Sequence, residues 1–289
     1  MDPEPKRWPG VGTGPFTLDK LARFDGWRNM LATMSAGALK KFPSWPRQYT
    51  VIDLNAGPGR YLLPTGRAVD GTPLLILRRL AASRFGIWRA AFVEHREPIA
   101  NELRGWLDQE ASKLGVDRGR YAVLHGDHST VVMPWVENSV PAKYGLGLLL
   151  HDPNGAPDFR LLEALVHEPR LIRFDVAVYL QATPLKRVRN LPPTRYDTTD
   201  WRRLDEAMVK VKRHWTVREP TGSNQYALCI GSNNPLPGTW TKRGFWPADS
   251  DRGRAILEQL TLTVTERQRL LQPSLGPEFD AQLIRSRVN

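Results

Sequence analysis

The stretch from Tyr49 to Gly59 constrains the fold of this chain more than any other. It is an apolar, β-branched run that ends at one carboxylate, Asp53, and then turns through Gly57 and Gly59. Buried parallel strands have such continuous apolar sequences, and glycines let the backbone approach a ligand closely. The stretch therefore predicts a strand that leads into a nucleotide pocket, as in a doubly wound α/β sheet.

The composition favours a polyanionic partner. The 289 residues carry a formal net charge of +11, and a charge of this size attracts nucleic acid through its long-range field and through counterion release. Many basic proteins bind no nucleic acid, so the charge alone names no target. The net charge is also compatible with a protein partner.

Cysteine and histidine usage exclude several site classes. The single cysteine, Cys229, rules out an intramolecular disulfide and a multi-cysteine zinc site, and its apolar neighbours predict a buried strand thiol. The six histidines have no metal-ligand spacing, so we expect no metal. No window approaches the roughly 18 apolar residues of a membrane span. The start, Met1-Asp-Pro-Glu-Pro, is unlike a secretory signal, and we expect a cytoplasmic protein without membrane contact.

The chain divides into an arm, one large domain and a tail. Residues 1–14 are rich in Pro and Gly and predict an extended arm, and residues 263–289 predict a weakly structured C-terminal tail. Between them, residues 15–262 predict one α/β domain, which begins with an amphipathic helix whose apolar positions run from Leu18 to Met34. The helix and the tail would decorate the sheet.

Within the domain, apolar β-branched runs alternate with helical patterns. The expected strands are 49–53, 89–94, 121–125, 144–151 and 174–180, and the expected helices include 98–114, 159–168 and 199–213. Another helix follows Gly71-Thr-Pro73, with Thr72 as its cap. Residues 60–70 predict an irregular loop, and the basic, proline-bearing residues 183–196 predict a mobile surface loop.

Two further strands close the domain. The runs 214–219 and 225–230 are joined by only five residues, too few for a helical crossover, so they predict an antiparallel hairpin. A doubly wound sheet of the nicotinamide type ends in parallel strands. Five parallel strands followed by such a hairpin resemble a class I methyltransferase, and the predicted fold is this Rossmann-like α/β sheet with N- and C-terminal decorations.

Residues 53–59, Asp-Leu-Asn-Ala-Gly-Pro-Gly, resemble the first motif of the S-adenosylmethionine-dependent methyltransferases. The motif has an acid, a position that is usually Gly or Phe and here is Asn55, and then Gly-x-Gly. In that family the glycine backbone contacts the amino-acid end of the cofactor, and the acid supports that network. The resemblance implies a cofactor site at Asp53, Asn55, Ala56, Gly57 and Gly59. Taken alone, the glycine pair would be an ordinary strand-to-turn connection.

Acidic residues also end the next two expected strands. Glu94 can accept hydrogen bonds from both hydroxyls of a ribose, because a fixed carboxylate offers two oxygens; alternatively it is a solvated strand-end residue. Asp127 matches the acid that in the family accepts from the adenine amino group. His128 can stack on the adenine or be exposed, and His95 completes the expected cofactor set.

Residues 152–155, Asp-Pro-Asn-Gly, resemble the fourth motif of amino-methyltransferases, Asp/Asn-Pro-Pro-aromatic. There the acid or amide and a backbone carbonyl accept from the target amine and align its lone pair. The resemblance implies catalytic roles for Asp152, Pro153 and Asn154, although Asn154 replaces the second Pro and Gly155 replaces the stacking aromatic residue. Stacking would then fall to Phe159, Tyr196 or Trp246. The alternative is an ordinary tight turn.

Over residues 17–260 the chain resembles the three-Cys-motif partner proteins, a family related to methyltransferases. The likeness lies in Asp53 to Arg60, Gly71-Thr-Pro-Leu74, Val93-Glu94 and Asp152-Pro with a following Gly. It implies cofactor binding and association with nucleic acid.

The basic aromatic loop, residues 233–247, combines cations with rings, a pairing that binds phosphates and stacks on bases. A core-capping aromatic cluster is the equal alternative. The expected nucleic-acid-binding residues, in this loop and elsewhere, are Arg60, Lys186, Arg187, Arg189, Arg195, Trp240, Lys242, Arg243 and Trp246.

Three functions follow as hypotheses. The first is an S-adenosylmethionine-dependent methyltransferase acting on an amino group of nucleic acid, with adenine N6 favoured. The second is a catalytically inactive, methyltransferase-like partner protein that binds nucleic acid. The third is an enzyme that uses a nicotinamide or another nucleotide on a similar sheet.

Overall fold

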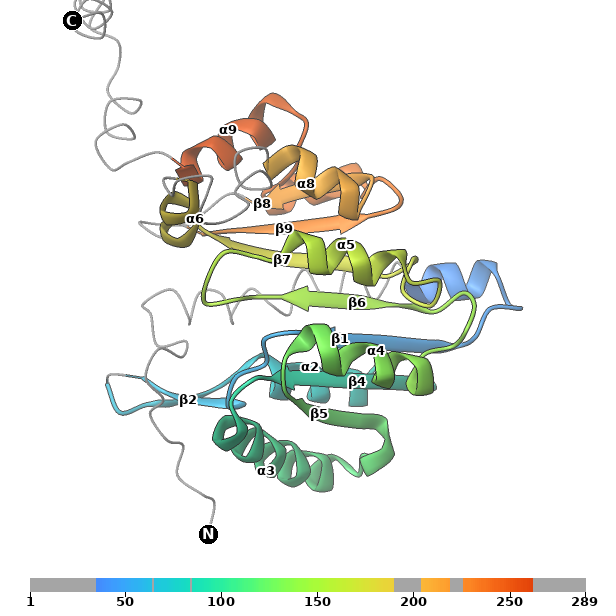
Figure 1. Cartoon of the computed structure of the whole chain (residues 1–289). Coiled ribbons are helices and arrows are strands. Elements are labelled where there is room, and N and C mark those ends of the chain that lie inside the picture. The colour runs from blue at the N-terminus through green and yellow to red at the C-terminus, as the bar shows by residue number, and fades with distance from the viewer. Residues whose placement is uncertain (1–34, 64, 84, 190–203, 219–225, 262–289) are drawn as a thin grey trace, which may run out of the picture.

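The computed structural model describes residues 35–63, 65–83, 85–189, 204–218 and 226–261. Their core is one eight-stranded sheet in the order β10-β8-β9-β7-β6-β1-β4-β5 (Figure 1). The strands are β1 (Gln48–Asp53), β4 (Ile87–Glu94), β5 (Tyr121–His125), β6 (Leu146–His151), β7 (Asp175–Gln181), β8 (His214–Arg218), β9 (Tyr226–Ser232) and β10 (Phe245–Pro247).

Strand order and direction confirm the predicted fold class. The five strands β1, β4, β5, β6 and β7 run parallel, and β9 lies antiparallel between β7 and β8. Counted from β5, the strands lie in the order β5, β4, β1, β6, β7, β9 and β8. The parallel strands are thus arranged as the third, second, first, fourth and fifth in the chain, and β9, the second strand of the hairpin, lies between β7 and β8. This is the sheet of a class I methyltransferase. Cys229 is buried in β9, as expected.

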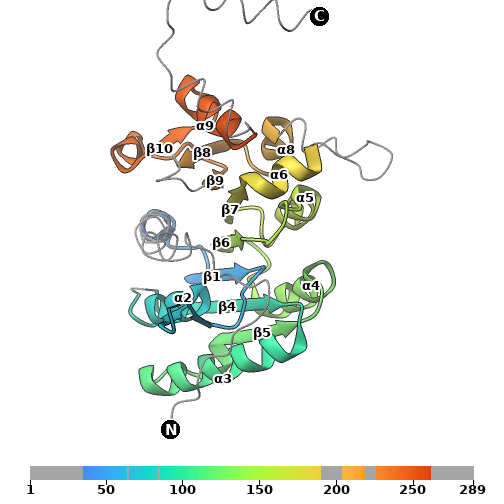
Figure 2. The ribbon, with the colours of Figure 1, turned by 90° about the vertical axis from the view of Figure 1, so that its left-hand side faces the viewer.

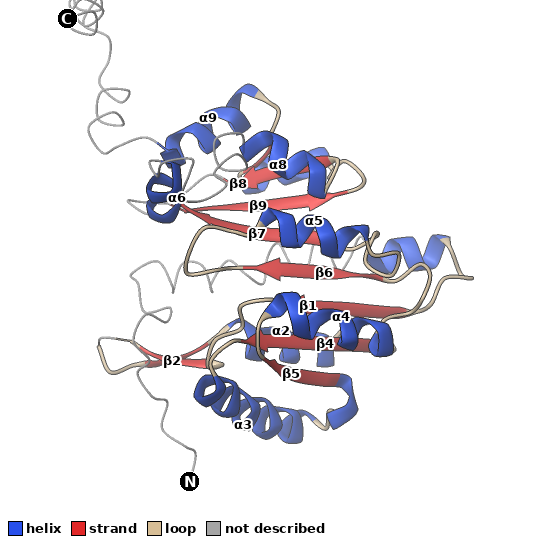
Figure 3. Ribbon diagram, in the orientation of Figure 1, coloured by secondary structure: helices blue, strands red, loops and turns tan. Residues whose placement is uncertain are grey.

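Helices cover both faces of the sheet (Figures 2 and 3). One face packs against α2 (Thr72–Ala81), α3 (Glu97–Leu114) and the helical residues 35–41, around buried side chains such as Leu77 and Leu103. The other face packs against α4 (His128–Ser139), α5 (Phe159–His167), α8 (Leu204–Val211) and α9 (Asp251–Thr261). Parallel strands buried on both faces explain the continuous apolar runs of the sequence.

Several predicted segments were wrong in detail. Residues 60–70 are not an irregular loop but a hairpin of β2 (Arg60–Leu62) and β3 (Ala68–Asp70). Helix α4 was not among the expected helices. Pro134 lies inside it, but Val132 and Val136 are buried, so tertiary packing outweighs the proline. The N-cap of α2 is Gly71, not Thr72.

The two segments predicted as basic loops contain regular structure. Residues 182–189 form α6 (Ala182–Arg189) directly after β7. The basic aromatic loop contains a 3-10 helix, η2 (Gly238–Arg243), and the edge strand β10, which pairs with β8. The arm 1–14, the helix positions from Leu18 to Met34 and the tail 263–289 lie outside the described residues.

Candidate functional site

The polar residues at the ends of the parallel strands meet at one edge of the sheet. Parallel strands end together, so Asp53 of β1, Glu94 of β4 and His151 of β6 lie at the same edge, where Asp53 pairs in register with Leu150 and Glu94 with His125. In open α/β sheets ligands bind at this carboxyl edge. The β2–β3 hairpin projects from it, at the left of Figure 1.

Asn55 connects the glycine loop, residues 53–59, to the turn after β6. Asp53 is buried, and its Oδ1 accepts a hydrogen bond from the backbone N–H of Asn55 at 3.1 Å. The Asn55 side chain in turn accepts, through Oδ1, the backbone N–H of Asp152 at 3.1 Å. The Asn55 side chain therefore holds residues 53–59 against the turn after β6.

Gly57 and Gly59 of the glycine loop have conformations that residues with side chains disfavour. Gly57 has φ +70° and Gly59 has φ +81°, in the left-handed region where glycine is the default residue. A Cβ on Gly59 would also lie 3.0 Å from Leu103 Cδ1. Both glycines and Ala56 are buried, so this backbone forms a fixed floor at the strand edge.

Glu94 is held in place by backbone groups. Its Oε2 accepts the N–H of Gly57 at 3.2 Å, and its Oε1 accepts the N–H of Arg96 at 2.9 Å. Each carboxylate oxygen has more than one acceptor direction, so the capacity to bind a diol remains. His95 beside it is exposed.

Asp127 also has a structural role that was not predicted from the sequence. It caps α4, and its Oδ1 accepts hydrogen bonds from the hydroxyl and the backbone N–H of Ser129. These bonds lower the pKa of Asp127, and His128 and His95 add to the effect, so the exposed carboxylate is charged at neutral pH. His128 is half-buried, and its ring lies 6.1 Å from that of His151, edge to face.

Two side chains absent from the sequence prediction hold the turn after β6. Gln181, the last residue of β7, donates from Nε2 to the carbonyl oxygen of Pro153 at 3.0 Å. His151 accepts the backbone N–H of Asp158 at Nε2, at 3.0 Å, and burial lowers its pKa to about 3. The turn is therefore fixed from three sides, and Asn154 at its tip is exposed.

Tyr61, in the segment predicted to be irregular, also belongs to the site. A Cβ on Gly57 would lie 2.8 Å from its hydroxyl oxygen. Burial raises the pKa of Tyr61, and the carboxylates of Asp152, Asp53 and Glu94 raise it further. The hydroxyl therefore lies within the field of the three strand ends. The sequence signal was an aromatic residue directly after the glycine motif.

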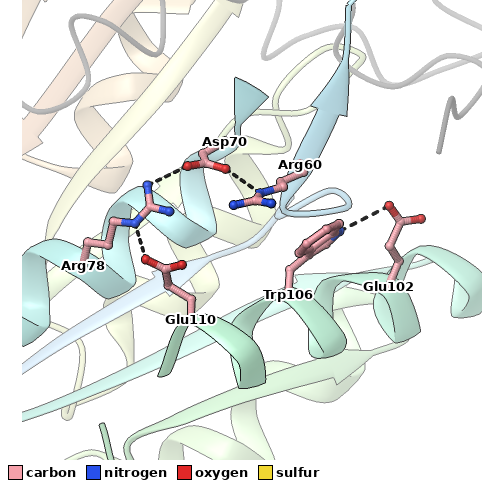
Figure 4. Close-up of polar contacts among 6 residues, drawn as sticks. All are labelled: Arg60, Asp70, Arg78, Glu102, Trp106 and Glu110. Carbon is pink, nitrogen blue, oxygen red and sulfur yellow. Dashed lines mark hydrogen bonds and ion pairs between the residues drawn. The ribbon is translucent and has the colours of Figure 1, made fainter. Parts of the chain in front are cut away.

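A polar network anchors the hairpin that carries Tyr61 (Figure 4). Asp70 accepts from Arg60 Nε at 2.7 Å and from Arg78 at 2.6 Å, and Arg78 also pairs with Glu110 of α3. The Arg60 guanidinium lies 4.4 Å from the Trp106 ring. Arg60, predicted to contact nucleic acid, thus has internal partners, and its predicted role remains a prediction.

The basic aromatic loop is partly core. Trp240 is only 3% exposed and packs edge to face on Phe245 at 5.1 Å, so the prediction that it stacks on bases was wrong, and the core-capping alternative holds for this ring. Lys242 and Arg243 are exposed, and Trp246 is half-buried. Hydrophobicity alone does not tell a stacking ring from a buried one.

The register of β10 places this loop at the carboxyl edge. Phe245 pairs with Arg218, the last residue of β8, and Lys242 and Arg243 immediately precede it. Helix α6, whose sequence includes Lys186, Arg187 and Arg189, starts at the same edge after β7. Arg195 and Tyr196 lie outside the described residues.

In the described part of the chain, no group of three or more His, Cys, Asp or Glu residues is arranged to hold a metal ion. Among the helices described, none has the length and apolar character needed to cross a membrane.

Comparisons with known proteins give only distant likenesses. No family model and no curated protein matches the chain. Protein LPL1258 from Legionella pneumophila is 11% identical over 80% of this chain and 90% of its own, with a TM-score of 0.40. The N-terminal domain of human METTL16 in complex with SAH is 12% identical over 71% of this chain and 70% of its own, with a TM-score of 0.37. A predicted O-methyltransferase from Agrobacterium tumefaciens, Atu636, is 14% identical over 63% and 73%, with a TM-score of 0.34.

Proposed function

We propose that this protein is an S-adenosylmethionine-dependent methyltransferase that acts on an amino group of nucleic acid, with adenine N6 as the favoured atom. One observation carries the proposal. The hydrogen bond between Asn55 and Asp152 joins a glycine loop suited to the cofactor to a turn suited to the amine. A transferase needs these two parts in fixed proximity.

The residues at the strand edge fit the cofactor. Because Gly57 and Gly59 carry no side chain of their own, the backbone of Ala56, Gly57 and Gly59 would lie against its amino-acid end. Glu94 would accept from the ribose hydroxyls, and Asp127, with His128 and His95 nearby, would lie at the adenine. The cofactor would supply an electrophilic methyl group on a sulfonium.

The turn after β6 would orient the amine. Asp152 and the Pro153 carbonyl would accept its hydrogens; this carbonyl already accepts from Gln181, but an oxygen with two lone pairs can accept a second bond. The nitrogen lone pair would then be aimed at the methyl group. The N–C bond would form as the sulfonium S–C bond breaks, and the proton lost by the amine would pass through the Asp152 carboxylate to water. Positioning supplies most of the catalysis in such a transfer.

The target would lie toward β7, β8 and β10. Along the carboxyl edge the order of strands puts the cofactor residues at β1, β4 and β5, Asp152 next to them at β6, and the basic segments beyond. Lys242 and Arg243, with Lys186, Arg187, Arg189 and Arg195, would bind phosphates. The formal charge of +11 supports a polyanionic target.

The inactive partner protein is the second candidate, because Gly155 offers no ring to stack on a flipped base. Phe159 is 3% exposed and cannot take that role. Trp246 and Tyr196 are the remaining rings among those expected from the sequence.

Cofactor choice is tested first, by calorimetric titration with S-adenosylmethionine, S-adenosylhomocysteine and NAD. The proposal expects binding of the first two and not of NAD. Preference for NAD would instead support the nucleotide-using enzyme.

Methyl transfer is tested with a radioactive methyl donor and DNA or RNA of mixed sequence. The wild-type protein is expected to label nucleic acid, and Asp152→Ala to lose the label while it still binds the donor. The exposed Asp249→Ala serves as the control. If nucleic acid binds tightly but takes up no label from the wild-type protein, the inactive partner is the correct function.

A further inference from the structure

Tyr61 fills a space that two glycines leave open. A Cβ on Gly57 would lie 2.8 Å from the Tyr61 hydroxyl oxygen, and a Cβ on Gly71 would lie 2.6 Å from its Cε2 atom. Real Cβ atoms do not approach other atoms this closely, so side chains at these two positions would displace the ring. The ring therefore reaches from the start of α2 to the cofactor motif.

The hairpin fixes the direction of this side chain. Successive residues of a strand point to opposite sides. Arg60 points toward Trp106 and Asp70, whereas its neighbour Tyr61 contacts Gly57. The ion pairs of Asp70 with Arg60 and Arg78 tie the hairpin to α2 (Figure 4). The position of the hydroxyl is thus set by structure outside the site.

The charges that act on the hydroxyl are three carboxylates, those of Asp152, Asp53 and Glu94. They raise its pKa together with burial, so the hydroxyl keeps its proton at all physiological pH values. A neutral hydroxyl has two lone pairs on its oxygen, and these favour a cationic group of a ligand that lies against Gly57.

We infer that Tyr61 recognises the positively charged sulfonium centre of the methyl donor, with its hydroxyl oxygen facing the S-methyl group. The inference rests on the proposed function and adds a residue that distinguishes the donor from its product. Methyl transfer converts the sulfonium to a neutral thioether. The contact would therefore favour the donor and be lost in the product, which helps the product to leave.

The test compares two ligands on one variant. Calorimetry would give the dissociation constants of S-adenosylmethionine and S-adenosylhomocysteine for the wild-type protein and for Tyr61→Phe. A weak contact between a polarised C–H group and oxygen is worth about a two- to fivefold change in affinity. We expect Tyr61→Phe to weaken donor binding by about this factor and to leave product binding unchanged.

Two further variants make the test specific. Tyr121→Phe removes a hydroxyl that bonds Asp108 at 2.7 Å at the start of β5, and it is expected to leave both affinities unchanged. Gly71→Ala keeps the hydroxyl but pushes the ring, and it is expected to reduce the donor preference in the same direction as Tyr61→Phe. The ratio of two affinities does not depend on the folded fraction, so partial unfolding cannot imitate the effect.

The inference is overturned if Tyr61→Phe weakens both ligands equally, since Tyr61 would then only support the loop. It is also overturned if both ligands bind more tightly, because the ring would then obstruct the pocket, or if neither affinity changes. These outcomes leave the proposed function intact. That function fails separately if the wild-type protein binds neither ligand.

Discussion

The side-chain oxygen of Asn55 accepts the backbone N–H of Asp152 at 3.1 Å, across the ends of two adjacent strands. The two residues are 97 positions apart in the sequence, yet one hydrogen bond joins the loops that follow β1 and β6. The residue that departs from the usual glycine motif is therefore the one that couples the two halves of the site. Asn55 therefore also fixes the position of the turn after β6.

The hydrogen bond between Asn55 and Asp152 predicts that Asn55→Ala lowers the turnover number more than it lowers the affinity for the cofactor. The variant leaves a partly buried N–H without its acceptor, which costs about 1–2 kcal/mol of unfolding free energy. Turnover should fall about tenfold or more, because displacement of the turn misaligns the amine. Denaturant unfolding and methyl-transfer kinetics measure the two effects. Asn101→Ala, at an exposed position of α3, should change neither; unchanged turnover in Asn55→Ala would contradict the coupling.

Gln181→Glu replaces the donor to the Pro153 carbonyl with a carboxylate of the same shape. Oxygen then faces oxygen, and the turn is expected to shift. We expect the turnover number to fall about tenfold or more while donor affinity stays within a factor of two. Steady-state kinetics combined with calorimetry separates these quantities. Gln109→Glu on α3 provides the matched control; a loss of donor affinity in Gln181→Glu would contradict a role confined to the turn.

Gln181 is a site residue that was not predicted from the sequence. The expected strand ended at Leu180, one residue too early, so the polar strand end that completes the site was missed. The ends of the expected strands 49–53, 89–94, 121–125 and 144–151 were correct, and the first two stop at an acid, Asp53 and Glu94. The expected strand 225–230 was too short, because β9 continues to Ser232. Period and composition thus place strands, whereas the last residue of a strand depends on its partner across the sheet.

Tyr61 and Trp240 could not be placed from the sequence for a different reason. The three-residue strands of the β2–β3 hairpin carry no periodic signal, and they are held by each other and by the contacts of Asp70. Trp240 lies among cations in a glycine- and proline-rich segment, which suggested that its side chain is exposed on the protein surface. Its burial follows from η2 folding onto β10, a contact that only the tertiary structure defines.

His151 predicts a specific pH dependence of stability. Its pKa is lowered from 6.5 to about 3 by burial, so between these values the unfolded chain binds a proton that the folded chain does not. Stability therefore rises with pH over this range, by at most about 1.4 kcal/mol per pH unit for one proton. His151→Gln cannot titrate and can still accept the Asp158 N–H, so it should show a smaller slope.

Urea unfolding of both proteins at pH 5 and pH 7 measures that slope. The difference between the two pH values should be smaller in His151→Gln than in the wild-type protein. His167→Gln, at an exposed position of α5, should leave the wild-type slope unchanged. Equal slopes in the wild-type protein and His151→Gln would show that folding does not change the pKa of His151.

Lys242 and Arg243 predict a measurable electrostatic contribution to nucleic-acid binding. Both are exposed at the carboxyl edge, so replacing them with Ser should leave the fold intact. If each neutralises one phosphate, the slope of log affinity against log salt concentration becomes shallower by about 2. Arg47→Ser with Lys143→Ser removes the same charge just before β1 and β6, at the opposite edge, and should leave the slope near its wild-type value. Fluorescence anisotropy across a salt series tests this, and equal slopes in both double variants would place the nucleic acid elsewhere.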